Sequence, residues 1–140
     1  MTEDRTPDVM NPKCPSRVIL SHVTSRWGVL VLIGLMDGTL RFGALRRRIG
    51  GVSERMLAQT LRALEQDGLV NRTAHPTIPP HVDYDLTASG AEIAIAVRHL
   101  ADSIERHLGM LMEQGIIPPD LAASSAYSHS MVPGGFDVTS

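Results

Sequence analysis

Residues 41–72 read RFGALRRRIGGVSERMLAQTLRALEQDGLVNR, and this stretch decides the fold. On both sides of Gly50-Gly51 its apolar residues recur at intervals of three and four, which is typical of two short amphipathic helices. Ser53 is a suitable N-cap for the second helix, and Gly68 suits the position just after its last turn. Two helices joined by a short turn with glycines predict a helix-turn-helix over residues 41–67.

The sequence that follows predicts a two-stranded hairpin. Residues 69–73 and 82–86 alternate apolar and polar side chains, as half-buried strands do. Three prolines lie between them and suit a hairpin tip better than the interior of a ladder (Pro76, Pro79, Pro80). A hairpin directly after a helix-turn-helix is a wing, here over residues 69–87.

The flanking segments predict further helices. Cys14-Pro15 opens one helical pattern, and the apolar stretch 27–36 predicts a second helix that ends at Asp37-Gly38. Residues 91–112 predict one long helix with an apolar stripe that no later segment covers (Ile93, Val97, Leu100, Ile104, Leu108, Leu111). We therefore expect a fold that is mainly α with a small β-hairpin, a winged helix-turn-helix whose terminal helices form a dimer.

These elements define the domain organisation. We expect one domain over residues 14–114, in which residues 91–114 form the dimerisation helix. Residues 1–13 and 115–140 are polar or rich in Pro, Ser, Ala and Gly, so we expect a flexible N-terminal arm and a flexible C-terminal tail.

Charge is distributed unevenly along a chain whose net charge is only −2. Residues 41–72 carry seven arginines against three acidic residues, a local net charge of +4. From Asp83 to the end, two arginines face eight acidic residues, a net charge of −6. This layout indicates a localised binding surface for a polyanion, on a chain whose acidic C-terminal third would repel the same polyanion.

The second helix of the helix-turn-helix predicts the contacts with double-stranded DNA. Its face opposite the leucine stripe presents the candidate base readers Arg55, Gln59 and Thr60, because Arg pairs bidentately with guanine and Gln with adenine. Phosphate contacts are expected from side chains that hold the duplex without reading its sequence (Arg46, Arg47, Arg48, Ser53, Arg62). The plainer interpretation, a solvated charged face, is disfavoured by the helix-turn-helix and wing around it.

The wing offers His75, Thr77 and His81 where many winged helices place arginine. Histidine is mostly neutral at pH 7, so one interpretation is a DNA contact that strengthens as pH falls. We favour the other, polar side chains on a solvent-facing hairpin. A metal site is not expected, because no cysteine or carboxylate accompanies the histidines at a recognisable ligand spacing.

Several other classes of function are disfavoured. No catalytic motif is present, and five aromatic residues offer little for stacking on single-stranded nucleic acid, so we expect neither an enzyme nor a cofactor. His99 and His107, with Asp102 and Glu105 nearby, are interpreted as the polar face of the long helix. A winged-helix protein-interaction module is the alternative class, and the arginines at 46–48 and 55 argue against it.

Short motifs follow one another in unbroken order over about residues 14–112. They are Cys14-Pro15, Arg26-Trp27, Asp37-Gly38, Arg41-Phe42, Leu45-Arg46, Val52-Ser53, Met56-Leu57, Leu61, Leu64, Asp67-Gly68-Leu69-Val70, Arg72, Pro79-Pro80, Val82, Tyr84, Leu86-Thr87 and Gly90. With these motifs the chain resembles a known family, the HxlR-type winged-helix regulators, which are related in fold to the MarR group. The resemblance implies a homodimeric repressor or activator that binds an inverted repeat, with dimer contacts from helices at both ends of the domain.

Cys14 is the one cysteine, which rules out an intramolecular disulfide framework. A helix N-terminus and the cations Lys13 and Arg17 favour its thiolate, the reactive form. The resemblance implies a sensor of oxidants or of electrophiles such as quinones and aldehydes. A buried and inert thiol is the alternative, and a small ligand held between the long helix and the wing is another route to regulation.

The chain has no visible signal peptide, since residues 1–11 are polar and lack a basic start followed by an apolar run. Its longest apolar run, residues 29–36, is too short to span a bilayer. We expect a cytoplasmic protein whose partners are double-stranded DNA and a second copy of itself, with no membrane partner.

Overall fold

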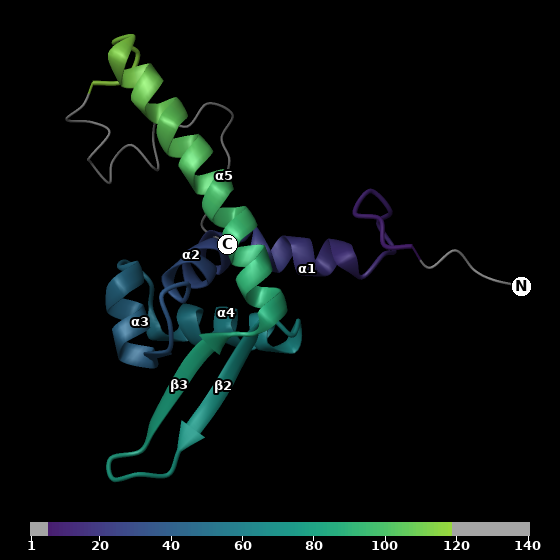
Figure 1. Cartoon of the computed structure of the whole chain (residues 1–140), viewed down its shortest axis with the longest axis vertical. Helices are drawn as coiled ribbons and strands as arrows, with labels where there is room; N and C mark the ends of the chain where they lie inside the picture. The colour runs from purple at the N-terminus through teal and green to yellow at the C-terminus, as the bar shows by residue number, and fades with distance from the viewer. Residues whose placement is uncertain (1–5, 119–140) are drawn as a thin grey trace, which may run out of the picture. The chain divides into compact units, whose positions relative to one another are not determined.

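The structure is a computed structural model, and it describes residues 6–118. In chain order its elements are α1 (Ser16–Val23), α2 (Arg26–Gly34), β1 (Leu40–Arg41), α3 (Phe42–Ile49), α4 (Glu54–Gln66), β2 (Val70–His75), β3 (His81–Leu86) and α5 (Ala88–Glu113) (Figure 1). The predicted winged helix-turn-helix, mainly α with a small β-hairpin, is confirmed, and a third short strand extends the hairpin to an antiparallel sheet. The chain divides within α5 into two compact units, residues 1–97 and 98–140.

The first unit holds the hydrophobic core. The predicted leucine stripe of α4 is fully buried, with Leu57, Leu61 and Leu64 at most 1% exposed. Removing this apolar surface from water is the main favourable term in folding, so the stripe fixes which face of α4 points inward. The core also takes residues from α1, α2, α3, the sheet, the start of α5 and the segments that connect these elements (Val23, Val31, Leu32, Leu35, Leu45, Val52, Leu69, Val70, Tyr84, Ala94, Val97).

The turn between α3 and α4 forms as its sequence predicts. Gly50 and Gly51 both adopt positive φ, at 71° and 77°, which glycine does without steric cost. The Ser53 hydroxyl oxygen accepts the Met56 backbone N–H at 3.1 Å and caps α4. At the other end Gly68 has φ +75°, and the next N–H donates back to the carbonyl of Leu64.

The sheet contains one strand that the sequence does not reveal. Its order is β1-β3-β2, with Leu40 opposite Tyr84 in the antiparallel pair of β1 and β3. Because β1 has only two residues, it shows no alternating pattern. The strands β2 and β3 pair from Val70 with Leu86 to His75 with His81, so the ladder continues further toward the tip than predicted. Figure 1 shows this hairpin extending beyond α3 and α4.

The helix α5 begins at Ala88, three residues earlier than predicted. The Thr87 hydroxyl accepts the Gly90 N–H at 2.9 Å and donates to the Gly68 carbonyl at 2.7 Å, which joins the helix start to the end of α4. A Cβ at Gly90 would lie 1.9 Å from the carbonyl oxygen of Leu69, so only glycine permits this close packing.

The second unit is described up to residue 118 and contains the rest of α5. After Glu113 the chain closes the helix, since Gly115 has φ +72° and the N–H of Ile117 donates to Leu111. Residues 115–118 therefore form a helix-ending turn where a tail was predicted, and the tail from 119 lies outside the described residues. Within residues 6–118, no helix is long and apolar enough to cross a membrane.

The predicted N-terminal arm is described from residue 6. Residues 8–14 form successive turns, in which the Asn11 N–H donates to Asp8 and the Cys14 N–H donates to Asn11. Side chains support these turns, since the carboxylate of Asp8 accepts the Met10 N–H at 2.9 Å. Residues 1–5 lie outside the described part.

Candidate nucleic-acid interface

The exposed face of α4 carries a polar stripe opposite its buried leucines. Arg55, Gln59 and Arg62 are spaced four and three residues apart, so they lie along one side of the helix. All three are exposed, and within residues 6–118 none of them forms an ion pair or a side-chain hydrogen bond. Their side-chain N–H groups are therefore available to donate hydrogen bonds to a partner such as DNA.

Thr60, the third candidate base reader, differs from its neighbours. It is only half-exposed, and its hydroxyl donates to the Met56 carbonyl at 2.8 Å. The single hydroxyl proton is thus used within the helix. What Thr60 offers a base is its methyl group and the remaining lone pair of its oxygen.

The structure separates the three arginines that the sequence groups together as phosphate contacts. Arg46 donates from Nε to the Val52 carbonyl at 3.0 Å, and its Nη1 lies 3.4 Å from Glu54. Arg48 is paired with Asp37, Nη2 to Oδ2 at 2.7 Å. Arg47 has no ion pair with any residue in 6–118. Successive helix residues point about 100° apart, which is why adjacent arginines have different partners.

A shallow groove lies at the helix-turn-helix turn, directly before α4. It is lined by two arginines of α3, by the turn and by Ser53 (Arg46, Arg47, Gly50, Gly51, Val52, Ser53). The Ser53 oxygen accepts a hydrogen bond as the helix cap, so its own proton remains available for a phosphate oxygen. The N-terminus of α4, with its unpaired N–H groups, adds a favourable field for an anion.

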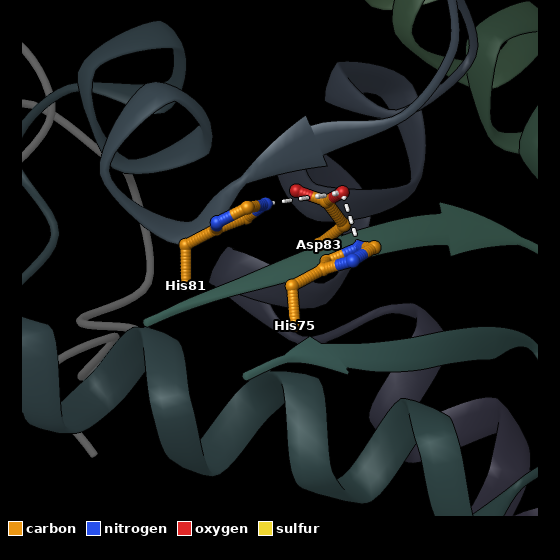
Figure 2. Close-up of side chains that lie close together, drawn as sticks. All are labelled: His75, His81 and Asp83. Carbon is orange, nitrogen blue, oxygen red and sulfur yellow. Dashed lines mark ion pairs between the residues drawn. The ribbon is translucent and has the colours of Figure 1, made fainter. Parts of the chain in front are cut away.

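The wing brings His75 and His81 together as a cross-strand pair, with ring centroids 4.5 Å apart and nearly parallel planes. The expectation that no carboxylate accompanies them is wrong. Asp83 Oδ2 lies 2.9 Å from His75 Nε2 and 3.8 Å from His81 Nε2, as Figure 2 shows. The signal for it was the spacing of His81 and Asp83, since residues two apart on a strand share one face.

Cys14 is half-buried, which lies between an exposed sensor thiol and the buried, inert thiol that the sequence left as the alternative. The Ser16 hydroxyl, which donates to its sulfur at 3.0 Å, and the backbone N–H of Asp8 lower the pKa of the Cys14 thiol. Hydrogen bonds therefore favour the thiolate, whereas the sequence suggested the helix N-terminus and the cations Lys13 and Arg17 as the cause.

The polar face of α5 is organised by Arg98. Its guanidinium donates to Asp102 at 2.7 Å and lies 3.5 Å from Glu105. The hydrogen bond from Arg98 lowers the pKa of the Asp102 carboxyl. His99 and His107 are exposed and take no part in these pairs, as expected for a solvated face.

An unpaired basic stripe on the second helix of a helix-turn-helix, with a hairpin wing after it, defines a winged helix-turn-helix transcriptional regulator. Residues 22–112 match the HxlR-like helix-turn-helix family. The chain belongs to this family.

Individual relatives agree with this assignment. The HTH-type transcriptional regulator YtfH of Escherichia coli strain K12 is 62% identical over 96 residues, which cover 69% of this chain and 76% of YtfH. The structure of ytfH from Salmonella typhimurium has 53% identity and a TM-score of 0.73, covering 80% of this chain and all of that one. Diamide-treated YodB from Bacillus subtilis has 31% identity and a TM-score of 0.57, covering 69% and 96%.

Proposed function

We propose that the protein binds an inverted repeat in double-stranded DNA as a homodimer, with α4 of each chain in the major groove. The observation that carries this proposal is the exposed stripe of Arg55, Gln59 and Arg62, whose donors have no partner within residues 6–118. A recognition helix with its N-terminal half against base edges needs such a face.

The contacts divide by position on the interface. Arg55 and Gln59, in the first half of α4, read bases, and Thr60 adds a methyl or acceptor contact. Arg47, Ser53 and Arg62 hold phosphates. Arg46 contributes mainly by stabilising the turn through its hydrogen bond to the Val52 carbonyl. Arg48 contacts a phosphate only if its ion pair with Asp37 is broken.

The dimer is proposed from apolar side chains that each unit leaves exposed. On α1, Val18 and Leu20 are 54% and 44% exposed. The second unit's part of α5 exposes three more, Leu100, Ile104 and Met110. Burial of these side chains against a second copy would remove them from water, and a twofold dimer matches two half-sites about one helical turn apart.

We propose Cys14 as the sensor of an oxidant or electrophile. The residue is only half-buried, and the lowered pKa of its thiol favours the thiolate. Oxidation would join the two Cys14 residues of a dimer in one S–S bond, with two protons and two electrons passing to the oxidant. The structural neighbour YodB has been treated with diamide, a thiol oxidant, which makes the same treatment the natural test here.

A ligand-responsive regulator without thiol sensing is the second candidate. A groove of about 540 Å³ lies between α4 and the hairpin, within the range of small-molecule sites. It is lined by Arg62, Glu65, Arg72, Tyr84 and two apolar residues of α4 (Ala58, Leu61). This location differs from the predicted one, between the long helix and the wing.

Fluorescence anisotropy with a labelled duplex tests DNA binding. Phosphate contacts release counterions, so affinity should fall steeply between 50 and 200 mM salt, by roughly 10³-fold if six phosphates are neutralised. Affinity independent of salt would favour the protein-interaction module. Diamide should release the wild-type protein and leave Cys14→Ser bound, and equal release of both would refute the thiol switch.

A further inference from the structure

The wing holds a compact cluster of three side chains, His75, His81 and Asp83, which we call the wing cluster (Figure 2). One ligand atom from each, two imidazole nitrogens and a carboxylate oxygen, lies within 4.8 Å of the other two. The ladder register sets this arrangement, because His75 pairs directly with His81 and Asp83 follows on the same face of β3.

A hydrogen-bond chain favours one tautomer of His81. The Thr77 hydroxyl donates its only proton to the Pro79 carbonyl at 2.9 Å, so toward His81 Nδ1, at 3.2 Å, it acts as acceptor. Nδ1 therefore carries the proton of the neutral ring, and Nε2 presents its lone pair. That lone pair faces the Asp83 carboxylate 3.8 Å away, an arrangement that favours a cation between them.

We propose that His75 Nε2, His81 Nε2 and the Asp83 carboxylate bind a divalent transition-metal ion of the Zn²⁺ class. Bonds of about 2.0–2.1 Å in a tetrahedral site place ligand atoms about 3.3 Å apart. The separations of 2.9 and 3.8 Å from Asp83 Oδ2 to the two nitrogens bracket that value. Two imidazoles and one carboxylate suit zinc and its neighbours better than Mg²⁺ or Ca²⁺, and leave the fourth position open.

The side chains can adjust to the ion. A metal lies in the plane of each ligating imidazole, so the two stacked rings must tilt for their lone pairs to converge. The side chains are 39%, 22% and 24% exposed for His75, His81 and Asp83, which gives the ion a path from solvent and leaves the rings room to turn. Thr77 is the positioning residue, because its acceptor oxygen orients the His81 ring.

The site also has a consequence for DNA binding, which rests on the proposed function. His81 lines a groove together with Arg41 and Arg47, between α3 and the hairpin. A bound divalent ion would turn the local negative charge of Asp83 into a net positive charge beside these arginines. The ion's open position suits a phosphate oxygen. Metal binding would therefore strengthen DNA binding at a wing that has no arginine or lysine near its tip.

Calorimetric titration of chelator-stripped, full-length protein with ZnCl₂ tests the site. We expect saturation at one ion per chain, with affinity about tenfold or more weaker in His81→Gln and Asp83→Asn. His107→Gln, which removes an imidazole from α5, and Cys14→Ser should bind as the wild type does. Circular dichroism checks that each variant is folded. Unchanged stoichiometry and affinity in His81→Gln, or no saturable binding at all, would overturn the proposal.

Thr77 provides a variant that leaves every ligand in place. Thr77→Val should weaken Zn²⁺ binding about 10- to 100-fold, the range for groups that orient a ligand, and Thr77→Ser should restore it. A further titration with labelled duplex separates the two proposals. If Zn²⁺ binds stoichiometrically but DNA binding is absent with and without it, the metal site stands and the DNA-binding proposal fails. Tight DNA binding without saturable Zn²⁺ binding would refute the metal site and leave the DNA-binding proposal intact.

Discussion

Arg46 Nε donates a hydrogen bond to the carbonyl of Val52 at 3.0 Å and so ties α3 to the last residue of the turn before the Ser53 cap. This contact gives one arginine of a basic run an architectural role. Its neighbour Arg47, unpaired within residues 6–118, is free for a different role. The two residues can therefore be distinguished by experiment.

Arg46→Ala should lower the free energy of unfolding by about 1 kcal/mol, the typical worth of one hydrogen bond, because the Val52 carbonyl loses its partner. Arg47→Ala should leave stability within about 0.5 kcal/mol and reduce the salt slope of DNA binding by about 1. Urea denaturation and anisotropy measure these quantities. Equal effects of both variants on stability would refute the distinction.

Arg55→Ala should weaken binding to the preferred operator by about 1–3 kcal/mol and relax base preference at one position of each half-site, because a bidentate contact to a base is lost. Binding to specific and random duplexes, compared at one salt concentration, measures the effect. Glu65→Ala, an exposed change further along α4, is the control. Equal losses on both duplexes would mean that Arg55 contacts only phosphate.

Leu57→Ala should destabilise the fold by roughly 2–5 kcal/mol, since a side chain with no exposed surface leaves a cavity in the core. Gln59→Ala, two residues along the same helix and exposed, should change stability by less than about 0.5 kcal/mol. Thermal and urea unfolding measure both. If the two variants were equally tolerated, the assigned orientation of α4 would be wrong.

Ser16→Ala should raise the pKa of the Cys14 thiol, because the hydroxyl that donates to its sulfur stabilises the thiolate. In the wild type, the pH midpoint of thiol alkylation should therefore lie below that of an ordinary cysteine, and the variant's midpoint should move upward. Iodoacetamide reaction rates across a pH series give both midpoints. Ser21→Ala, which removes a hydroxyl bonded to the Val18 carbonyl, is the control and should not shift the midpoint.

The sequence predicts the helices, the hairpin and the buried face of α4 because their information is local. Apolar spacing identifies Leu57, Leu61 and Leu64 as the inward stripe, and capping chemistry places Ser53 and Gly68 at the ends of α4. The strand β1 cannot be predicted in this way, because two residues show no periodicity and form a strand only by pairing with the distant Tyr84.

The candidate site is only partly predictable for the same reason. Exposure of Arg55 and Gln59 follows from the helix period, whereas the bond from Arg46 to Val52 depends on the path of the turn. The wing cluster depends on register, because only the pairing of β2 with β3 brings His75 beside Asp83. The second partner of Cys14, the backbone N–H of Asp8, comes from an irregular turn, which no periodic pattern describes.

Selection of duplexes from a randomised library by the purified full-length protein tests the central claim most directly. We predict enrichment of an inverted repeat whose half-sites are about 10 base pairs apart centre to centre, the spacing of two recognition helices in a twofold dimer. Retention of the library without enrichment of any sequence, or enrichment of a single half-site alone, would contradict this claim.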